Sequence, residues 1–170
     1  MEVRLARPEE HEAIGQLTVE AYAALAGDED VLGDYEHELR DVANRASDCD
    51  VLVAVGDHQE LLGAVTYVPG PGTALSEFAD PDAAGIRMLA VAPDHQGAGV
   101  GRALTKACIS RARGDGRSKI VLHSTDLMKV ARAMYEKLGF VAAPQRDVFF
   151  TEPPFTEAQP LHLIAYVLTL

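Results

Sequence analysis

The chain has 170 residues, with 15 Lys and Arg against 26 Asp and Glu and a formal net charge of −11. This length suits a single domain spanning residues 1–170, and the lack of a secretory signal or of an apolar run of about 18 residues predicts a cytoplasmic protein without a membrane span. The charge disfavours nucleic acid as the main partner, and none is expected, because binding of a phosphate backbone needs a concentrated basic face. No metal site is expected, and Cys49 and Cys108 form no CxxC pair, so both are predicted to be reduced and buried.

The charge is unevenly distributed along the chain. Residues 1–85 hold 4 Lys and Arg and 19 Asp and Glu, a balance of −15, whereas residues 86–170 hold 11 and 7, a balance of +4. This asymmetry is compatible with a polyanionic cofactor bound by the second half and a cationic substrate that approaches the first. The simpler alternative is that the acidic surface only keeps the protein in solution.

Hydrophobic periodicity and turn residues predict the secondary structure. In chain order they indicate a strand in the first five residues, helices at 9–25 and 35–46, strands at 51–55, 61–68 and 85–92, a helix at 100–113, a strand at 119–124, a helix at 127–138, and strands at 148–150 and 161–168. The element order is therefore βααβββαβαββ. This is an α/β (α+β) domain of about seven strands and about four helices.

One stretch, from Ile86 to Leu104, runs from an apolar strand through a glycine-rich turn into a helix. Such a turn offers backbone N–H groups that can hold an anion. A P-loop is excluded, because no GxxxxGK followed by Ser or Thr occurs. A dinucleotide fingerprint is disfavoured, because the third glycine of GxGxxG would fall on Leu104. A purely structural glycine turn remains an alternative.

Two motifs resemble those of a known family. Leu89-Ala-Val91, Pro93 and Gln96-Gly-Ala-Gly-Val-Gly101, followed by Arg102, resemble the Q/R-x-x-G-x-G/A cofactor motif of the GNAT superfamily of N-acetyltransferases. The segment from Ala131 to Phe140 resembles that family's second signature, a helix that carries a tyrosine and ends in Gly-Phe. The motifs stand in the family's order and at its usual separation, and the element order extends the resemblance to the whole chain.

The resemblance implies that acetyl-CoA is the cofactor and that it binds where two parallel strands of a mixed central sheet, at 85–92 and 119–124, splay apart. The implied cofactor-binding residues are Leu89, Ala90, Val91, Gln96, Gly97, Ala98, Gly99, Val100, Gly101, Arg102, Ala131 and Arg132. The first three would pair with the pantetheine amides as an added strand would, and the N–H groups of the turn would hold the pyrophosphate. Candidates to neutralise the remaining phosphates are Arg102, Lys106, Lys129 and Arg132.

By the same resemblance, Tyr135 is the expected general acid, which donates a proton to the departing thiolate. A backbone N–H near Leu89 or Ala90 would polarise the carbonyl. The expected base is His123, which lies where some relatives carry an acidic residue.

The sequence departs from the family pattern at two places. Many relatives carry a glutamate on the strand before the glycine turn, and this strand has none; Glu77, His95 and a water chain are therefore rivals of His123 for the base. Met128 stands where many relatives have an asparagine that reaches the pantetheine. These departures leave the acceptor chemistry open.

The predicted function is transfer of an acetyl group to a primary amine, either a cationic small molecule or a protein amine, by direct attack. The predicted wall of the acceptor pocket comprises Tyr22, Tyr35, Tyr67, Phe149 and Phe155. A non-catalytic acyl-CoA-binding sensor on the same fold and an enzyme that uses a longer acyl-CoA are the alternatives. A homodimer, common in the family, could form through the closing strands.

Overall fold

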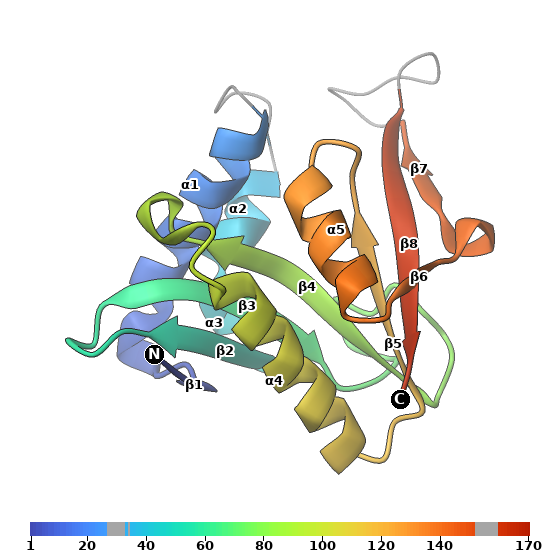
Figure 1. Ribbon diagram of the computed structural model, residues 1–170, viewed down its shortest axis with the longest axis horizontal. Helices are drawn as coiled ribbons and strands as arrows, with labels where there is room; N and C mark the ends of the chain where they lie inside the picture. The colour runs from blue at the N-terminus through green and yellow to red at the C-terminus, as the bar shows by residue number, and fades with distance from the viewer. Residues whose placement is uncertain (27–32, 34, 152–159) are drawn as a thin grey trace.

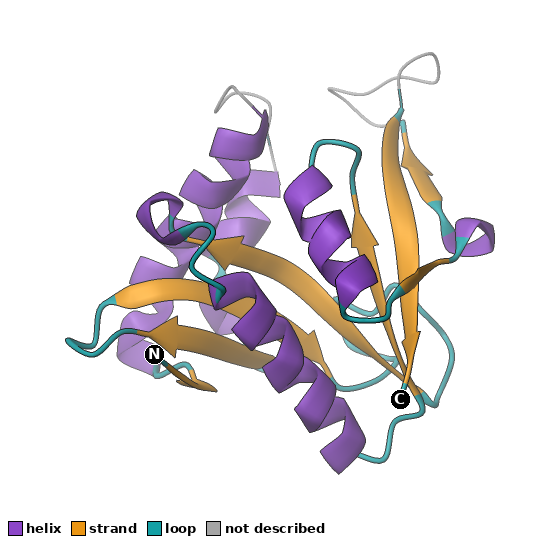
Figure 2. Cartoon of the chain, viewed as in Figure 1, coloured by secondary structure: helices purple, strands orange, loops and turns teal. Residues whose placement is uncertain are grey.

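A mixed sheet with helices on both faces organises the chain in the computed structural model, which describes residues 1–26, 33, 35–151 and 160–170 (Figure 1). The strands are β1 (Glu2–Leu5), β2 (Asp50–Val55), β3 (Leu61–Val68), β4 (Ala83–Val91), β5 (Lys119–Ser124), β6 (Val141–Ala142), β7 (Val148–Phe150) and β8 (Leu161–Thr169). The helices are α1 (His11–Ala26), α2 (Tyr35–Arg40), α3 (Val42–Arg45), α4 (Val100–Gly114) and α5 (Lys129–Lys137). Figure 2 shows the same elements by type.

The eight strands lie in the order β1-β2-β3-β4-β5-β8-β6, with β7 paired to β8. The pairs are antiparallel except β4 and β5, which run parallel. The predicted mixed α/β fold is confirmed. Strand β6 was not predicted, because two residues are too short to show an alternating pattern.

The predicted helix at 35–46 is wrong in one respect, since the structure divides it into α2 and α3 at Asp41. The backbone of Asp41 is not helical (φ −79°, ψ 68°), and its carboxylate accepts a hydrogen bond from the backbone N–H of Asn44 at 3.1 Å. An aspartate that caps a new helix in this way competes with continuation of the preceding one. The sequence pattern identified the helical segment but not this cap.

Both faces of the sheet are buried, because successive side chains of a strand point to opposite sides. On β2, Leu52 and Ala54 belong to the core cluster that includes Leu104 of α4, whereas Val53 packs in a second cluster with Ile14 of α1. Helices α1 to α3 therefore cover one face, and α4 and α5 cover the other (Figure 1). Cys49 and Cys108 are buried free thiols, as predicted.

The parallel strands β4 and β5 separate partway along their length. They pair from Ala83 with Lys119 to Ile86 with Leu122, and no pairing between them follows in the described residues. Beyond that point β4 stays paired to β3, and β5 stays paired to β8. The edge of β4 that faces β5 is thus left open over residues 87–91.

A β-bulge accompanies this separation. The register between β3 and β4 shifts between Ala64 and Thr66, and Met88 has a positive φ of 51°. As a result Arg87 faces the α1 side of the sheet, where it pairs with Glu77, and Met88 faces that side as well, in a cluster with Leu39 of α2. From Leu89 to Val91 the side chains again alternate between the two faces of the sheet. No helix in the described parts of the chain is long and apolar enough to cross a membrane.

Candidate active site

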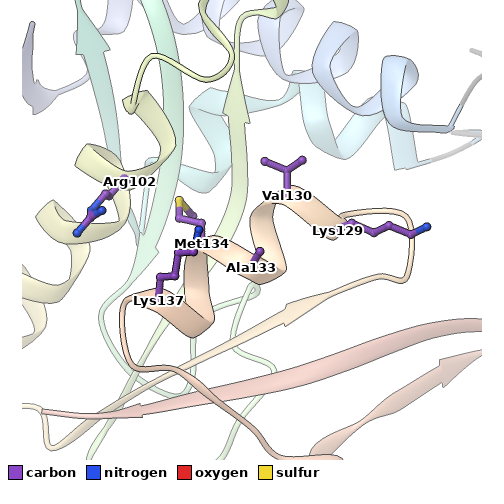
Figure 3. Close-up of a pocket in the computed structure, with 6 residues that line it drawn as sticks. All are labelled: Arg102, Lys129, Val130, Ala133, Met134 and Lys137. Carbon is purple, nitrogen blue, oxygen red and sulfur yellow. The ribbon is translucent and has the colours of Figure 1, made fainter.

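A groove of about 480 Å³ lies between α4 and α5 (Figure 3). Its lining consists of Arg102, Lys129, Val130, Ala133, Met134 and Lys137. Three of these six side chains are cations, and Val130 is 87% exposed although it is apolar. A groove with an apolar floor and positive flanks suits an extended ligand that carries several negative charges.

The glycine-rich turn stands at the start of α4 beside this groove. Gly97 and Gly99 have φ values of +79° and +84°, a backbone conformation that side chains other than glycine rarely adopt. Gly99 is the N-cap of α4 and has no side chain to satisfy the first turn. Among the described residues, the backbone N–H groups of 100–102 have no hydrogen-bond partner. They form a set of donors at the positive end of a helix dipole.

The turn also connects the groove to the open edge of β4. A Cβ atom placed on Gly101 would lie 3.5 Å from Val91 Cγ2, 3.7 Å from Met134 Sδ and 3.8 Å from Leu89 Cδ2. Residues of the groove, the turn and the separated strand thus meet at Gly101. This is the place where a ligand that lies in the groove would reach the unpaired backbone of β4.

Tyr135, the residue after Met134 on α5, is 5% exposed. Its ring packs against Phe140 and Tyr166, with centroids 5.6 Å and 6.4 Å away. Burial raises the pKa of the Tyr135 hydroxyl, so the group stays protonated at neutral pH. The Tyr135 side chain therefore belongs to the core between the sheet and helices α4 and α5.

A second group of polar side chains lies on the α1 side of the sheet. His123 of β5 hydrogen-bonds through Nδ1 to Glu77 Oε2 at 2.6 Å and through Nε2 to the carbonyl oxygen of Arg146 at 3.0 Å. Arg87 of β4 forms an ion pair with the other oxygen of Glu77, and its guanidinium interacts with the hydroxyl of Tyr35. These contacts join β4, β5 and the segment before β4.

The pKa values of Glu77 and His123 reflect this pairing. Burial acts to raise the pKa of Glu77, but the hydrogen bond to His123 and the charge of Arg87 lower it overall. Burial acts to lower the pKa of His123, but the hydrogen bonds to Glu77 and to the Arg146 carbonyl raise it overall. Because a carbonyl oxygen can only accept, Nε2 of His123 carries a proton, and a second proton lies between Nδ1 and Glu77.

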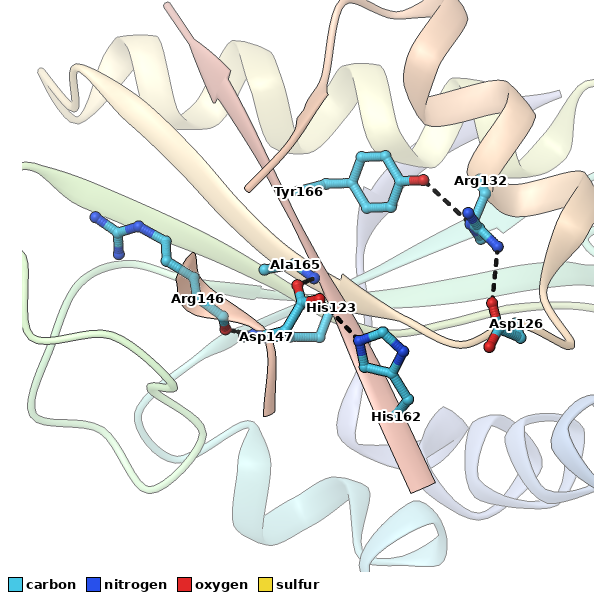
Figure 4. A network of polar contacts seen from close by, with 8 residues as sticks. All are labelled: His123, Asp126, Arg132, Arg146, Asp147, His162, Ala165 and Tyr166. Atoms are coloured by element: carbon cyan, nitrogen blue, oxygen red, sulfur yellow. Dashed lines mark hydrogen bonds and ion pairs between the residues drawn. The ribbon is translucent and has the colours of Figure 1, made fainter. Parts of the chain in front are cut away.

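The structure separates the predicted cofactor residues into two groups. Leu89 to Val91 and the turn from Gln96 to Arg102 lie together beside the groove. On α5, however, Ala131 packs against the core, and Arg132 donates to the Tyr166 hydroxyl at 3.1 Å and to Asp126 at 3.2 Å (Figure 4). Neither residue lines the groove. Lys106 does not line it either, whereas Arg102 and Lys129 do.

Four groove residues and one cation were missed by sequence reasoning. Val130, Ala133, Met134 and Lys137 follow the i, i+3, i+4, i+7 spacing of one helix face, and this pattern is the signal that could have found them. Arg87 gave no such signal, because its position beside Glu77 depends on the fold.

The predicted wall residues also separate. Tyr22 and Tyr35 lie together on the α1 side, with ring centroids 6.2 Å apart. Tyr67 is fully buried and donates a hydrogen bond to Asp115 at 2.7 Å, so it is a core residue under α4. Phe149 is 58% exposed and stacks on His162, which itself pairs with Asp147 (Figure 4). Phe155 lies outside the described residues. No group of three or more His, Cys, Asp or Glu in the described parts of the chain could hold a metal ion.

The groove and the open edge of β4 form a candidate site for an elongated polyanionic ligand. Comparisons with known proteins identify the family. Residues 12–140 match the model of the acetyltransferase (GNAT) family. Since these residues make up most of the chain, the chain belongs to the acetyltransferase (GNAT) family. The reaction of this family is N-acetyl transfer, and its acyl donor is acetyl-CoA.

Individual relatives agree with this assignment. Mycothiol acetyltransferase of Cellulomonas flavigena is 36% identical over 104 residues, which are 61% of this chain and 29% of that protein. N-acetyltransferase family 8 member 3 of Rattus norvegicus is 30% identical over 84 residues, 49% of this chain and 36% of that protein. The matched residues therefore make up about a third of the length of these relatives.

Solved structures show the same fold over the whole chain. A GNAT-family acetyltransferase of Staphylococcus aureus has a TM-score of 0.74 at 14% identity, and covers 99% of this chain and 98% of that one. A putative acetyltransferase of Salmonella typhimurium, solved with its cofactor acetyl-CoA, has a TM-score of 0.69 at 20% identity, and covers 99% of this chain and 93% of that one.

Proposed function

We propose that this chain acts in the cytoplasm and transfers the acetyl group of acetyl-CoA to a primary amine of a small molecule or a protein by direct attack. One observation carries the proposal: the cation-lined groove, the donors at the start of α4 and the open edge of β4 meet around Gly101, and Tyr135 directly follows the groove residue Met134 on α5. This arrangement supports Tyr135 as a proton donor near the end of the site where the reactive part of an extended cofactor would lie.

The residues present fit acetyl-CoA. Arg102, Lys129 and Lys137 would face its phosphates, and the N–H groups of residues 100–102 would bind the pyrophosphate. The edge of residues 89–91 that faces β5 is open and would pair with the pantetheine amides. When bound there, acetyl-CoA supplies a thioester that is already activated for acyl transfer.

Tyr135 is proposed as the general acid. Its raised pKa keeps the hydroxyl protonated at neutral pH, as an acid requires before it donates to a thiolate. A backbone N–H near Leu89 or Ala90 would stabilise the negative charge that develops on the carbonyl oxygen. Cys108 does not compete as an acyl carrier, because burial raises the pKa of its thiol to about 12.

The base is proposed to be the pair of His123 and Glu77. The ring nitrogens of His123 both face acceptors, so the imidazole has no free lone pair for a substrate proton. A proton from the amine would therefore reach the pair through the Glu77 carboxylate, which is 25% exposed, while the His123 side chain is 5% exposed. Glu77, which the sequence offered as an alternative base to His123, would therefore act together with His123.

An assay of thiol release with acetyl-CoA across a panel of amines tests the proposed function. Amine-dependent release, with the acetylated amine identified by mass spectrometry, would support it. Tight binding of CoA without release for any small amine or protein N-terminus would contradict it and favour the non-catalytic sensor.

We also propose that β7 provides a contact between two copies of the chain. In the described residues β7 pairs only with β8, and its Val148, Phe149 and Phe150 are 38%, 58% and 44% exposed. An edge strand with three consecutive exposed apolar residues invites pairing. Sedimentation should show a dimer that Phe150→Asp disrupts and that Leu25→Asp, an exposed position on α1, leaves intact. A monomeric parent chain would refute this contact.

A further inference from the structure

The side chain of Ser124, the last residue of β5, is buried without a hydrogen-bond partner. It is 2% exposed, and no donor or acceptor in the described residues bonds to its hydroxyl oxygen. The other buried side-chain atoms without a partner in this part of the chain are the Nε atoms of Arg4, Arg45 and Arg117, whose guanidinium groups bind through another nitrogen. Ser124 has only one polar side-chain atom. Because a buried polar group without a partner costs free energy, its presence needs a physical reason.

Ser124 lies where β5 has separated from β4. The last paired residues of the two strands are Ile86 and Leu122, and Ser124 follows Leu122 by two residues, which span about 7 Å on a strand. Continued in the same register, Ser124 would pair with Met88, where the bulge of β4 lies. On the other side, β5 stays paired to β8, with Ser124 opposite Ile164. The missing neighbour of Ser124 is therefore on the side of β4.

The side chain of Ser124 points to the face of the sheet that α4 and α5 cover. Alternate residues of a strand point to the same face, and Leu122 belongs to the core cluster that contains Tyr135. Ile164, opposite Ser124 on β8, packs against the same cluster. The hydroxyl groups of Ser124 and Tyr135 are therefore carried on the same side of the sheet as the groove.

The order of the site along β4 decides which part of an extended ligand would lie beside Ser124. The groove and the turn approach β4 at Leu89 and Val91, through Gly101. The open edge of β4 runs from there back to Met88, the position that faces Ser124 in register. A ligand whose phosphates lie at the turn therefore extends toward Ser124 with its opposite end. In acetyl-CoA that end is the thioester.

We propose that the Ser124 hydroxyl donates a hydrogen bond to the sulfur of CoA as the thioester breaks. The proposal rests on the proposed acetyl transfer and adds a second donor to Tyr135. In this step the amine nitrogen bonds to the acetyl carbon, the carbon–sulfur bond breaks with its electron pair going to sulfur, and the amine proton passes to the base. Tyr135 gives its proton to the sulfur, and Ser124 keeps its own.

The contact acts mainly on the departing group. A hydrogen bond to an anionic sulfur is stronger than one to the neutral sulfur of a thioester, so Ser124 stabilises the thiolate more than the bound acetyl-CoA. The hydroxyl turns toward β4 by rotation about its Cα–Cβ bond, which moves a serine oxygen between staggered positions. The free energy that the unpaired hydroxyl costs in the chain alone is then recovered when the sulfur lies beside it.

Calorimetry with CoA and with desulfo-CoA, in which hydrogen replaces the thiol group, tests this contact without any turnover. The two ligands carry the same phosphates and the same pantetheine amides. The parent chain should bind CoA more tightly than desulfo-CoA, and this ratio of affinities should grow between about pH 7 and pH 9, where a thiol ionises. Ser124→Ala should lower the ratio about tenfold at the upper end of this range, as for loss of a hydrogen bond to a charged group. Its affinity for desulfo-CoA should stay close to that of the parent chain.

Thermal melting of the chain without ligand is the second measurement. Since an unpaired buried hydroxyl costs free energy, Ser124→Ala should keep or raise the melting temperature. Thr18→Val is the matched control, because the Thr18 hydroxyl is buried and donates to the carbonyl oxygen of Ile14 at 2.7 Å. That variant should lower the melting temperature by about 2–4 °C and leave the ratio of affinities for CoA and desulfo-CoA unchanged.

Two outcomes would overturn the inference. Ser124→Ala could leave the ratio of affinities unchanged, which would show that the hydroxyl does not contact the sulfur. The same variant could also lower the melting temperature of the ligand-free chain as Thr18→Val does, which would show that the hydroxyl already has a partner. A failure of the proposed function is a different result, because the parent chain would then release no thiol with any amine.

Discussion

Replacement of Tyr135 by phenylalanine should abolish most of the activity and leave the fold intact. The ring would keep its contacts with Phe140 and Tyr166, whose centroids lie 5.6 Å and 6.4 Å away. Loss of the hydroxyl leaves no hydrogen-bond partner unpaired among the described residues. The free energy of unfolding should therefore change by less than about 1 kcal/mol. Loss of a general acid lowers kcat by about 10²- to 10⁴-fold, or about 3–5 kcal/mol of transition-state stabilisation. The two effects are therefore separable.

The assay measures kcat, the KM for acetyl-CoA and the thermal midpoint of the Tyr135→Phe protein. Tyr166→Phe is the matched control, since its hydroxyl binds Glu136 and Arg132. That variant should lose about 1 kcal/mol of stability for each hydrogen bond but keep kcat within a few-fold. The acid role would be refuted if Tyr135→Phe retained kcat within a few-fold of the parent at an unchanged KM.

Three further predictions follow from the turn, the groove and the imidazole. Gly101→Ala should weaken CoA binding, measured by calorimetry, without lowering the melting temperature, since the new Cβ would meet Val91 only at 3.5 Å. Gly99→Ala, at a φ of +84°, should instead cost roughly 1–2 kcal/mol of stability. Equal melting temperatures for the two variants would contradict this difference. Lys137→Gln should raise the KM for acetyl-CoA about twofold to fivefold, and Arg113→Gln, at the far end of α4, should not. The pKa of His123 in the folded protein is raised above 6.5, so its stabilising effect is full below pH 6.5 and is lost as pH rises through the folded pKa. The difference in free energy of unfolding between the parent chain and His123→Gln should therefore shrink over that range. A difference that stays constant would contradict the pairing of His123 with Glu77.

The fold could be predicted largely from local patterns, because most elements are long enough to show their period. The β-branched apolar run of β2 and the glycine end of α4 each identify their element without reference to the rest of the chain. The bulge at Met88 could not be predicted, because no glycine or asparagine marks its positive φ of 51°. It accompanies the shift in register against β3, where Arg87 and Met88 both face the α1 side of the sheet.

The candidate cofactor site was predictable where its residues are contiguous. The turn from Gln96 to Arg102 depends on its own glycines and backbone, so the motif alone indicates it. On α5 the motif gave the helix but not its rotation about its axis. Ala131 and Tyr135 point to the core, whereas Lys137 faces the groove, and only packing against the sheet fixes this orientation.

The charge distribution of the first half shows why a summed charge is a weak guide to a substrate. The balance of −15 over residues 1–85 suggested a cationic amine, yet Asp50 pairs with Arg111 and Glu77 pairs with Arg87. Exposed charges farther away than the Debye length, about 8 Å at physiological ionic strength, are largely screened, and buried ones are screened much less. If the exposed acidic residues of the first half attract a cationic acceptor, kcat/KM for a polyamine should fall several-fold between roughly 0.05 M and 0.5 M salt. A value that does not change with salt would show that these exposed charges do not attract the acceptor.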